Sequence, residues 1–149
     1  MDLQGRAAVI TGGGRGIGSH IARMLAENGA TVVVSARSVD EIESVSKSLR
    51  SEGYEAHAIP CDVANETSVE TMAQEVSRRI GNVDILVNNA GIAHSNPVKV
   101  LQIEEWERTL VINATGTFLC TRAFLGSMID QGWGRVINVA SIAGLQGGQ

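Results

Sequence analysis

The amino-acid sequence predicts an α/β fold in which a doubly wound parallel sheet of about five strands is covered by helices on both faces. Short apolar, β-branched runs alternate with longer stretches of helical periodicity along nearly the whole chain. Such alternation is typical of parallel strands that are joined by helices. The strands are near-continuous apolar runs, as Thr31-Val32-Val33-Val34 shows, which indicates that both faces of the sheet are buried.

Five short segments have the length and composition of buried strands, because each is an apolar run rich in Val, Ile or Ala. The predicted strands span residues 7–11, 31–36, 56–60, 83–88 and 135–140.

Four helices are predicted between these strands. They span residues 16–28, 39–52, 66–80 and about 103–131. A glycine ends each one, at Gly29, Gly53, Gly81 and Gly132. The spacing of Ser38 and Glu41 predicts a capping box at the start of the second helix. The last helix is apolar over much of its surface, so we expect it to be buried on two sides or to form part of an oligomer interface.

Composition and length limit the possible classes of protein. The 149 residues suffice for a single domain with its own core, and 44% hydrophobic with 19% charged residues is a globular composition. A net charge of −4 argues against a nucleic-acid partner. The two cysteines are far apart without a C-x-x-C pattern, which favours buried thiols in a reducing compartment. There is no signal-peptide pattern and no apolar run of the roughly 18 residues that a membrane span needs, so we expect a cytoplasmic protein without membrane contact.

Residues 11–18 form a glycine-rich loop between the first strand and the first helix. They read Thr-Gly-Gly-Gly-Arg-Gly-Ile-Gly. Glycines let the backbone approach a ligand closely, and a helix N-terminus presents free N–H groups to an anion. The spacing is neither G-x-G-x-x-G nor a P-loop, because Ser19 and not lysine follows Gly18. The pattern is Gly-x-x-x-Gly-x-Gly, which predicts a nucleotide phosphate loop; the alternative is a flexible turn.

Each of the other four strands is also followed by residues that could take part in a site. These are Ser35-Ala36-Arg37, Cys61-Asp62-Val63, Asn88-Asn89-Ala90-Gly91 and Ser141. The carboxyl ends of parallel strands meet at one edge of the sheet, where open α/β sheets bind their ligands. The sequence therefore predicts one ligand site at this edge.

Together these motifs resemble the short-chain dehydrogenase/reductase family over the whole chain. The resemblance is carried by Thr-Gly-x-x-x-Gly-x-Gly at 11–18, Asp62-Val63, Asn-Asn-Ala-Gly at 88–91, Asn113 within residues 111–116, and Gly-Arg-Val-Ile-Asn-Val-Ala-Ser at 134–141. It implies a Rossmann-type NAD(P)-binding domain. It also implies an oxidoreductase that transfers hydride between NADP(H) and a small-molecule carbonyl or alcohol, with no metal site.

The resemblance implies a role for residues of every patch. The cofactor-binding residues would be Gly12, Gly14, Arg15, Gly16, Ile17, Gly18, Arg37, Asp62, Val63, Asn89, Ala90 and Gly91. Asp62 would hydrogen-bond the adenine amino group with Val63 beside the ring, and residues 89–91 would line the adenosine-ribose side. Asn113 would support the proton relay, and Ser141 would hydrogen-bond the substrate carbonyl. The structural alternatives are a polar turn at 88–89, a satisfied core asparagine and an ordinary turn serine.

The charge after the second strand favours NADP over NAD. An acidic residue there would hold the ribose 2′-hydroxyl of NAD, whereas an arginine accommodates the 2′-phosphate of NADP. This segment reads Ser35-Ala36-Arg37-Ser38 without a carboxylate, and Arg15 in the glycine loop is expected on the same side. Two guanidinium groups suit a dianionic phosphate. The alternative is that both arginines are solvated surface charges.

The chain departs from the family in one motif, the Tyr-x-x-x-Lys that follows the serine and supplies the proton donor. The only tyrosine is Tyr54, which is followed four residues later by Ala58, and the only lysines are Lys47 and Lys99. We therefore expect residues 1–149 to be the N-terminal portion of a longer reductase, cut short in the substrate loop at 141–149, without the last strands and the substrate lid. This portion would bind cofactor at best. We expect the longer parent to be a homotetramer or homodimer.

Two functions from different classes remain open. The first is NADPH-dependent carbonyl reduction by the parent protein, on a substrate such as an oxoacyl thioester, sugar, steroid or small ketone; the chain has a general likeness to oxoacyl-carrier-protein reductases. The second is a non-catalytic dinucleotide-binding or regulatory module. Asn113 and Ser141 argue against the module, because a pure binder needs neither. A Tyr-x-x-x-Lys motif in the downstream genomic sequence would decide between them.

Overall fold

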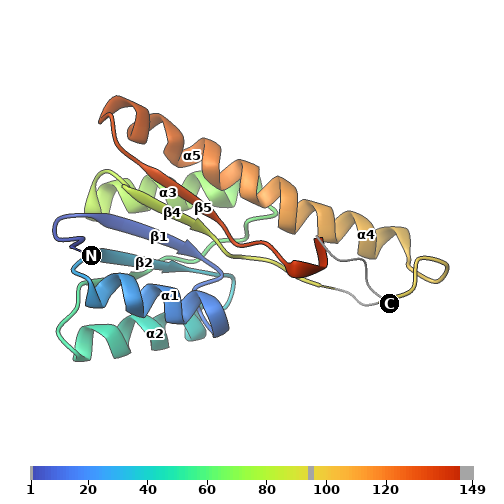
Figure 1. Cartoon of the computed structure of the whole chain (residues 1–149), viewed down its shortest axis with the longest axis horizontal. Helices are drawn as coiled ribbons and strands as arrows, with labels where there is room; N and C mark the ends of the chain where they lie inside the picture. Colours follow the sequence, from blue (N-terminus) through green and yellow to red (C-terminus); the bar gives the residue numbers. More distant parts are fainter. Residues whose placement is uncertain (1, 94–95, 145–149) are drawn as a thin grey trace.

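The computed structural model describes residues 2–93 and 96–144 and contains one parallel five-stranded sheet (Figure 1). The strand order is β3-β2-β1-β4-β5. The strands are β1 (Ala7–Thr11), β2 (Thr31–Ser35), β3 (Ala56–Ala58), β4 (Ile85–Asn88) and β5 (Arg135–Asn138). The order reverses at β1, where β2 lies on one side and β4 on the other, so the predicted doubly wound parallel sheet is confirmed.

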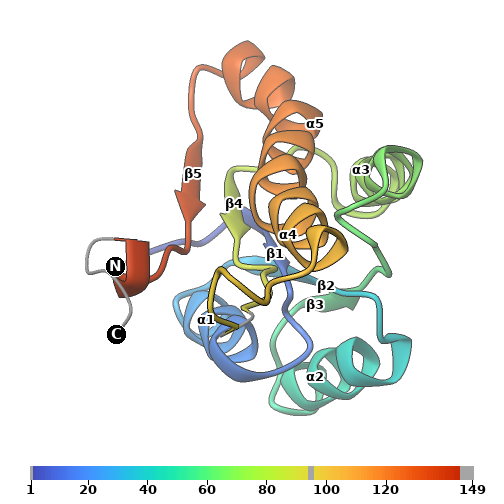
Figure 2. The ribbon, with the colours of Figure 1, turned by 90° about the vertical axis from the view of Figure 1, so that its right-hand side faces the viewer.

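Helices cover both faces of this sheet (Figure 2). They are α1 (Gly16–Glu27), α2 (Val39–Ser51), α3 (Glu66–Ile80), α4 (Ile103–Leu110) and α5 (Gly116–Asp130). The pair α1 and α2 packs on one face, and α3 with α5 packs on the other. A π-helical turn, Val111–Thr115, joins α4 to α5, so the predicted long helix is continuous but contains a wider turn around Asn113.

Alternate strand residues enter two separate cores. Val9, Val33 and Leu86 pack with the apolar side chains of α3 and α5. Their strand neighbours, such as Ile10 and Val34, pack with α1 and α2, and all of these side chains are fully buried. This is the two-sided burial that the continuous apolar runs predicted.

The predicted helix ends are largely confirmed, and one predicted cap is wrong. Gly29, Gly53, Gly81 and Gly132 all have positive φ just after a helix. Ser38 is the N-cap residue of α2, but its side chain makes no capping hydrogen bond. The capping box with Glu41 therefore does not form, because the Glu41 carboxylate is turned toward Arg15 of the glycine loop. Asn65 does cap α3, where its side chain accepts a hydrogen bond from the Ser68 N–H at 2.9 Å.

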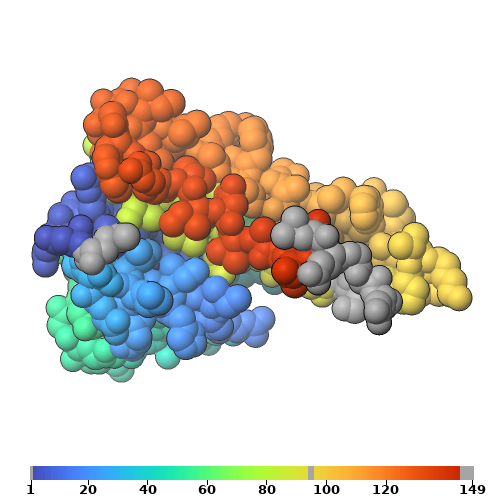
Figure 3. Space-filling view, in the orientation of Figure 1, coloured from blue at the N-terminus to red at the C-terminus, as the bar shows by residue number. Residues whose placement is uncertain are grey.

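The α4–α5 segment is packed on one side only. The buried side chains of α5 are Leu119, Cys120, Phe124 and Met128, whereas α4 has none. In Figure 3 the chain around α4 projects beyond the body formed by the sheet and the other helices. None of the helices within residues 2–93 and 96–144 is long and apolar enough to cross a membrane.

Candidate functional site

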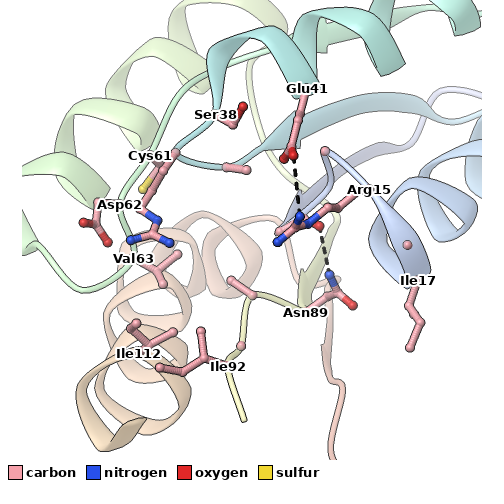
Figure 4. Close-up of a pocket in the computed structure, with 17 residues that line it drawn as sticks. Arg15, Ile17, Ser38, Glu41, Cys61, Asp62, Val63, Asn89, Ile92 and Ile112 are labelled. Carbon is pink, nitrogen blue, oxygen red and sulfur yellow. Dashed lines mark hydrogen bonds and ion pairs between the residues drawn. The ribbon is translucent and has the colours of Figure 1, made fainter. Parts of the chain in front are cut away.

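A cleft of about 720 Å³ lies at the carboxyl edge of the sheet, where the glycine loop meets the ends of β2, β3 and β4 (Figure 4). Every predicted cofactor-binding residue except Gly18 lines it. The rest of its wall consists of Ala36, Ser38, Glu41, Cys61, Ile92 and Ile112. The fold therefore brings together patches that are widely separated in the sequence, as the parallel topology predicted.

The glycine loop has little room for side chains. A Cβ on Gly18 would lie 2.4 Å from the carbonyl oxygen of Gly12, and one on Gly12 would lie 2.9 Å from the Cα of Ala90. Gly16 differs, because it has φ +55° and nothing lies within 4 Å of the position of its Cβ. The close packing thus needs Gly12 and Gly18, whereas the free space at Gly16 is where a ligand can approach the backbone.

The N-terminus of the helix that follows the loop has no side-chain cap. Arg15 is the N-cap residue of α1 and gives no side-chain hydrogen bond to the first turn, which also contains no acidic residue. The first N–H groups of a helix lack intrahelical partners, and the helix dipole favours negative charge there. The start of α1 is therefore suited to a phosphate group.

Hydrogen bonds tie the glycine loop to the end of β4. The hydroxyl of Thr11 donates to the Val87 carbonyl at 3.3 Å and accepts from the N–H groups of Asn89 and Ala90, both at 3.1 Å. The Asn89 amide donates to the carbonyls of Thr11 and Gly12 at 3.0 and 3.2 Å. Sequence reasoning did not predict this role of Thr11. The signal for it is the position of Thr11 at the end of β1, directly before the glycines.

Asp62 and Val63 form the wall near β3. One carboxylate oxygen of Asp62 accepts from the N–H of Ala64 at 3.0 Å, and the Asp62 N–H donates to the Ser68 hydroxyl at 2.9 Å. The second oxygen, Oδ2, accepts no hydrogen bond from the part of the chain that the structure describes. Val63 packs against Gly116, where a Cβ would lie 2.9 Å from its Cγ2. Asp62 is therefore held in place with one acceptor left free.

The cleft contains two arginines and one carboxylate. Arg15 and Arg37 both line it, as expected. Glu41, which sequence reasoning missed, also lines it and lies 3.7 Å from Arg15, measured from Oε1 to Nη1 (Figure 4). No salt bridge joins Arg37 to any residue in the described ranges. The segment at 35–38 contains no carboxylate, but Glu41, one helical turn beyond Arg37, adds a carboxylate to the cleft.

The two predicted catalytic residues are not brought together. The side chain of Asn113 accepts from the N–H of Ile92 at 2.9 Å and donates to its carbonyl at 2.8 Å, which fixes the chain just after Asn-Asn-Ala-Gly. Ser141 is exposed after β5, where its hydroxyl accepts from the Ala143 N–H at 3.2 Å. Neither residue lines the cleft, and no hydrogen bond joins them within residues 2–93 and 96–144. Residues 145–149 of the expected substrate loop lie outside the described residues.

Both cysteines are free and buried, as the sequence suggested. Burial raises the pKa of the Cys61 thiol, and it raises that of Cys120 to about 12. Cys61 lies in the cleft wall, and its thiol is neutral and weakly nucleophilic at physiological pH. The described residues contain no group of three or more His, Cys, Asp or Glu that could hold a metal ion.

A family model for the short chain dehydrogenases matches residues 6–149. The chain belongs to this family. It is 37% identical over 148 residues to a 3-oxoacyl-acyl-carrier-protein reductase of Aquifex aeolicus, an alignment that covers 99% of this chain and 60% of that protein. An oxidoreductase of Thermotoga maritima without an assigned activity is 40% identical over 146 residues, covering 97% of this chain and 56% of the other.

Solved structures of the family are similar in fold and sequence. One is a gluconate 5-dehydrogenase of Burkholderia cenocepacia in complex with NADP and tartrate, with a TM-score of 0.90, 38% identity, and coverage of 95% of this chain and 55% of that one. Another is an actinorhodin polyketide ketoreductase with NADPH, with a TM-score of 0.93, 38% identity, and coverage of 99% and 58%. The chain therefore spans little more than half of the length of these proteins.

Proposed function

We propose that this chain is the cofactor-binding portion of an NADP-dependent oxidoreductase that interconverts a carbonyl compound and an alcohol. The observation that carries the proposal is the cleft at the carboxyl edge, which is lined by the glycine loop, both arginines and Asp62. The complexes of similar structures with NADP and NADPH support this choice of cofactor.

The glycine loop and the start of α1 would hold the pyrophosphate. The free space beside Gly16 is the kind of cradle that a close-lying phosphate fills, and the unpaired N–H groups of the first turn would donate to it. Gly12 and Gly18 would act indirectly, because they let the loop pack against β4 and α1. This division of roles fits a dinucleotide better than a flexible turn, in which none of these contacts would matter.

The adenosine end would lie between β2 and β3. The free Oδ2 of Asp62 would accept a hydrogen bond from the adenine amino group, and Val63 would contact the ring. Arg15 and Arg37 would hold the 2′-phosphate through charge-assisted hydrogen bonds. A guanidinium group presents several N–H donors in a planar fork, which suits the oxygens of a phosphate.

In the proposed reaction the cofactor would supply the hydride, and this chain would supply a hydrogen-bond donor for the carbonyl oxygen. When bound, NADPH provides the hydride for the carbonyl carbon. Ser141 would donate a hydrogen bond to the carbonyl oxygen and so polarise it, while Asn113 holds the backbone at Ile92. The 149 residues contain no Tyr-x-x-x-Lys motif to protonate that oxygen, so we expect cofactor binding without turnover. An oxoacyl thioester is one candidate substrate, supported by the similarity to the Aquifex reductase.

We also propose that the α4–α5 face joins copies of the chain. This face exposes large apolar side chains: Ile103, Trp106, Leu110, Phe118, Leu125 and Ile129. Such a concentration of exposed apolar groups marks an interaction surface, which fits the expected homodimer or homotetramer of the longer parent.

A non-catalytic dinucleotide-binding module is the second candidate. The structural use of the Asn113 amide on Ile92 is the observation that favours it. Downstream coding sequence with a Tyr-x-x-x-Lys motif would favour the enzyme, and added to the chain it should produce turnover. If the extended protein binds cofactor but has no activity, the module is favoured.

Fluorescence titration of the purified chain with NADPH and NADH tests the proposal. We expect saturable binding of both, with NADPH tighter. The matched pair Arg37→Gln and Arg50→Gln removes one arginine inside and one outside the cleft. Only Arg37→Gln should weaken the binding of NADPH. Absence of NADPH binding by folded chain would refute the proposed function.

A further inference from the structure

Glu41 places a negative charge inside the cleft, close to where the proposed function needs positive charge. It lies in the first turn of α2 and lines the cleft together with Arg37 and Ser38. The glycine loop packs directly on it, since a Cβ on Gly14 would lie 2.9 Å from the Glu41 Cβ and 3.2 Å from its Oε2. The Glu41 side chain therefore lies beside the glycine loop, and its carboxylate remains 40% exposed on the side of the cleft.

The contact between Glu41 and Arg15 is loose and replaceable. Their closest charged atoms are 3.7 Å apart, which is longer than a hydrogen bond, and the Arg15 side chain is 84% exposed. Exposed ion pairs of this kind contribute little to stability. A guanidinium has five N–H donors, so Arg15 can turn to a stronger anion at small cost.

We propose that Glu41 sets the discrimination between NADP and NAD by competing with the 2′-phosphate for Arg15. The inference rests on the proposed function. A dianionic phosphate at Arg15 must lie near the Glu41 carboxylate and is repelled by it, whereas the 2′-hydroxyl of NAD is neutral. An acidic group at this end of a dinucleotide site also accepts a hydrogen bond from that hydroxyl. The preference for NADP is thus weaker than Arg15 and Arg37 alone would give.

Charge neutralisation at Glu41 tests the proposal directly. Glu41→Gln keeps the shape of the side chain and removes its charge. Two like charges a few ångströms apart in water repel enough to change affinity by about three- to tenfold, less in high salt. We therefore expect NADPH to bind the variant of the 149-residue chain about three- to tenfold more tightly, with NADH changed by less than about twofold or weakened.

Asp40→Asn is the matched control, because Asp40 lies in the same first turn of α2 and does not line the cleft. It makes the same change in net charge and removes the same kind of interaction with the helix dipole. It should leave the ratio of NADPH to NADH affinity unchanged. The gain from Glu41→Gln should also shrink in an Arg15→Gln background, because the competition for Arg15 is then lost and only the direct repulsion of the phosphate remains. A purely structural role of Glu41 would not depend on Arg15 in this way.

Three results would overturn the proposal: weaker NADPH binding by Glu41→Gln, an equal gain from Asp40→Asn, or a gain that is undiminished without Arg15. Adenosine 2′,5′-bisphosphate and 5′-AMP give a second measurement, in which only the former should respond to Glu41→Gln. If the unaltered chain binds neither dinucleotide, the proposed function itself fails. If it binds both and the variants behave alike, only the role of Glu41 fails.

Discussion

Replacing Gly16 by alanine tests whether a ligand approaches the backbone at this residue, because the substitution does not disturb the packing of the loop. The Cβ of an alanine at Gly16 meets no atom within 4 Å, so the folded chain has room for it. The backbone has φ +55°, however, and a left-handed conformation costs a non-glycine residue about 1–2 kcal/mol. For a chain of this length that corresponds to a fall in Tm of about 2–8 °C. The methyl group would occupy the free space that we assign to the pyrophosphate.

Gly132→Ala is the matched control for backbone strain. Gly132 has φ +69°, nothing lies within 4 Å of its Cβ position, and it follows α5 outside the cleft. Both variants should lose similar stability in thermal unfolding followed by circular dichroism. Only Gly16→Ala should lose NADPH affinity, by about tenfold or more, which is about 1.4 kcal/mol. Unchanged affinity in folded Gly16→Ala chain would refute the role assigned to the loop.

Four further predictions follow from the same contacts. In Arg37→Asp, NADPH affinity measured by titration should fall far more than NADH affinity, and equal losses would contradict the assignment of Arg37 to the 2′-phosphate. Thr11→Val leaves two backbone N–H groups without an acceptor, so the free energy of unfolding measured in urea should fall by about 1–3 kcal/mol. The control Thr71→Val removes an exposed hydroxyl from a helix and should change that free energy by less than about 0.5 kcal/mol. Burial raises the pKa of both thiols, in the case of Cys120 to about 12, so in alkaline solution the folded chain binds more protons than the unfolded chain. The free energy of unfolding should therefore fall as the pH rises from about 9 toward 12. Alkylation of the two thiols at pH 8 should be slow until denaturant is added. The 149-residue chain should show no NADPH-dependent ketone reduction, and robust turnover would contradict the need for Tyr-x-x-x-Lys.

The strands and helices were predictable because their signals are local. The predicted and observed bounds agree for residues 7–11 and 66–80, where an apolar run and a capped amphipathic helix lead to unambiguous ends. The third strand ends at Ala58 and not at residue 60, although the N–H groups of Ile59 and Cys61 still donate to the carbonyls of Val34 and Ala36. The π-helical turn around Asn113 was not predictable, because the apolar pattern of the helix is the same with or without one wider turn.

The position of the site at the strand ends was predictable from the sequence. The presence of the negatively charged Glu41 in it was not. Parallel topology alone brings the patches at the ends of β1 to β4 to one cleft. The inward turn of Glu41 depends on how closely the glycine loop packs against α2, which is a tertiary contact that no spacing in the sequence reveals. The failed capping box has the same origin, because the side chain that should have completed it faces Arg15.

Amide hydrogen exchange with and without NADPH tests the central claim, that the cleft at the carboxyl edge binds the dinucleotide. Bound cofactor should protect amides of the glycine loop at 12–18 and those at 62–63 and 89–91. The polar hollow at the opposite edge of the sheet, around Asp2 and Tyr54, should remain unchanged and serves as the internal control. Protection confined to that opposite edge, or none at saturating NADPH, would contradict the account.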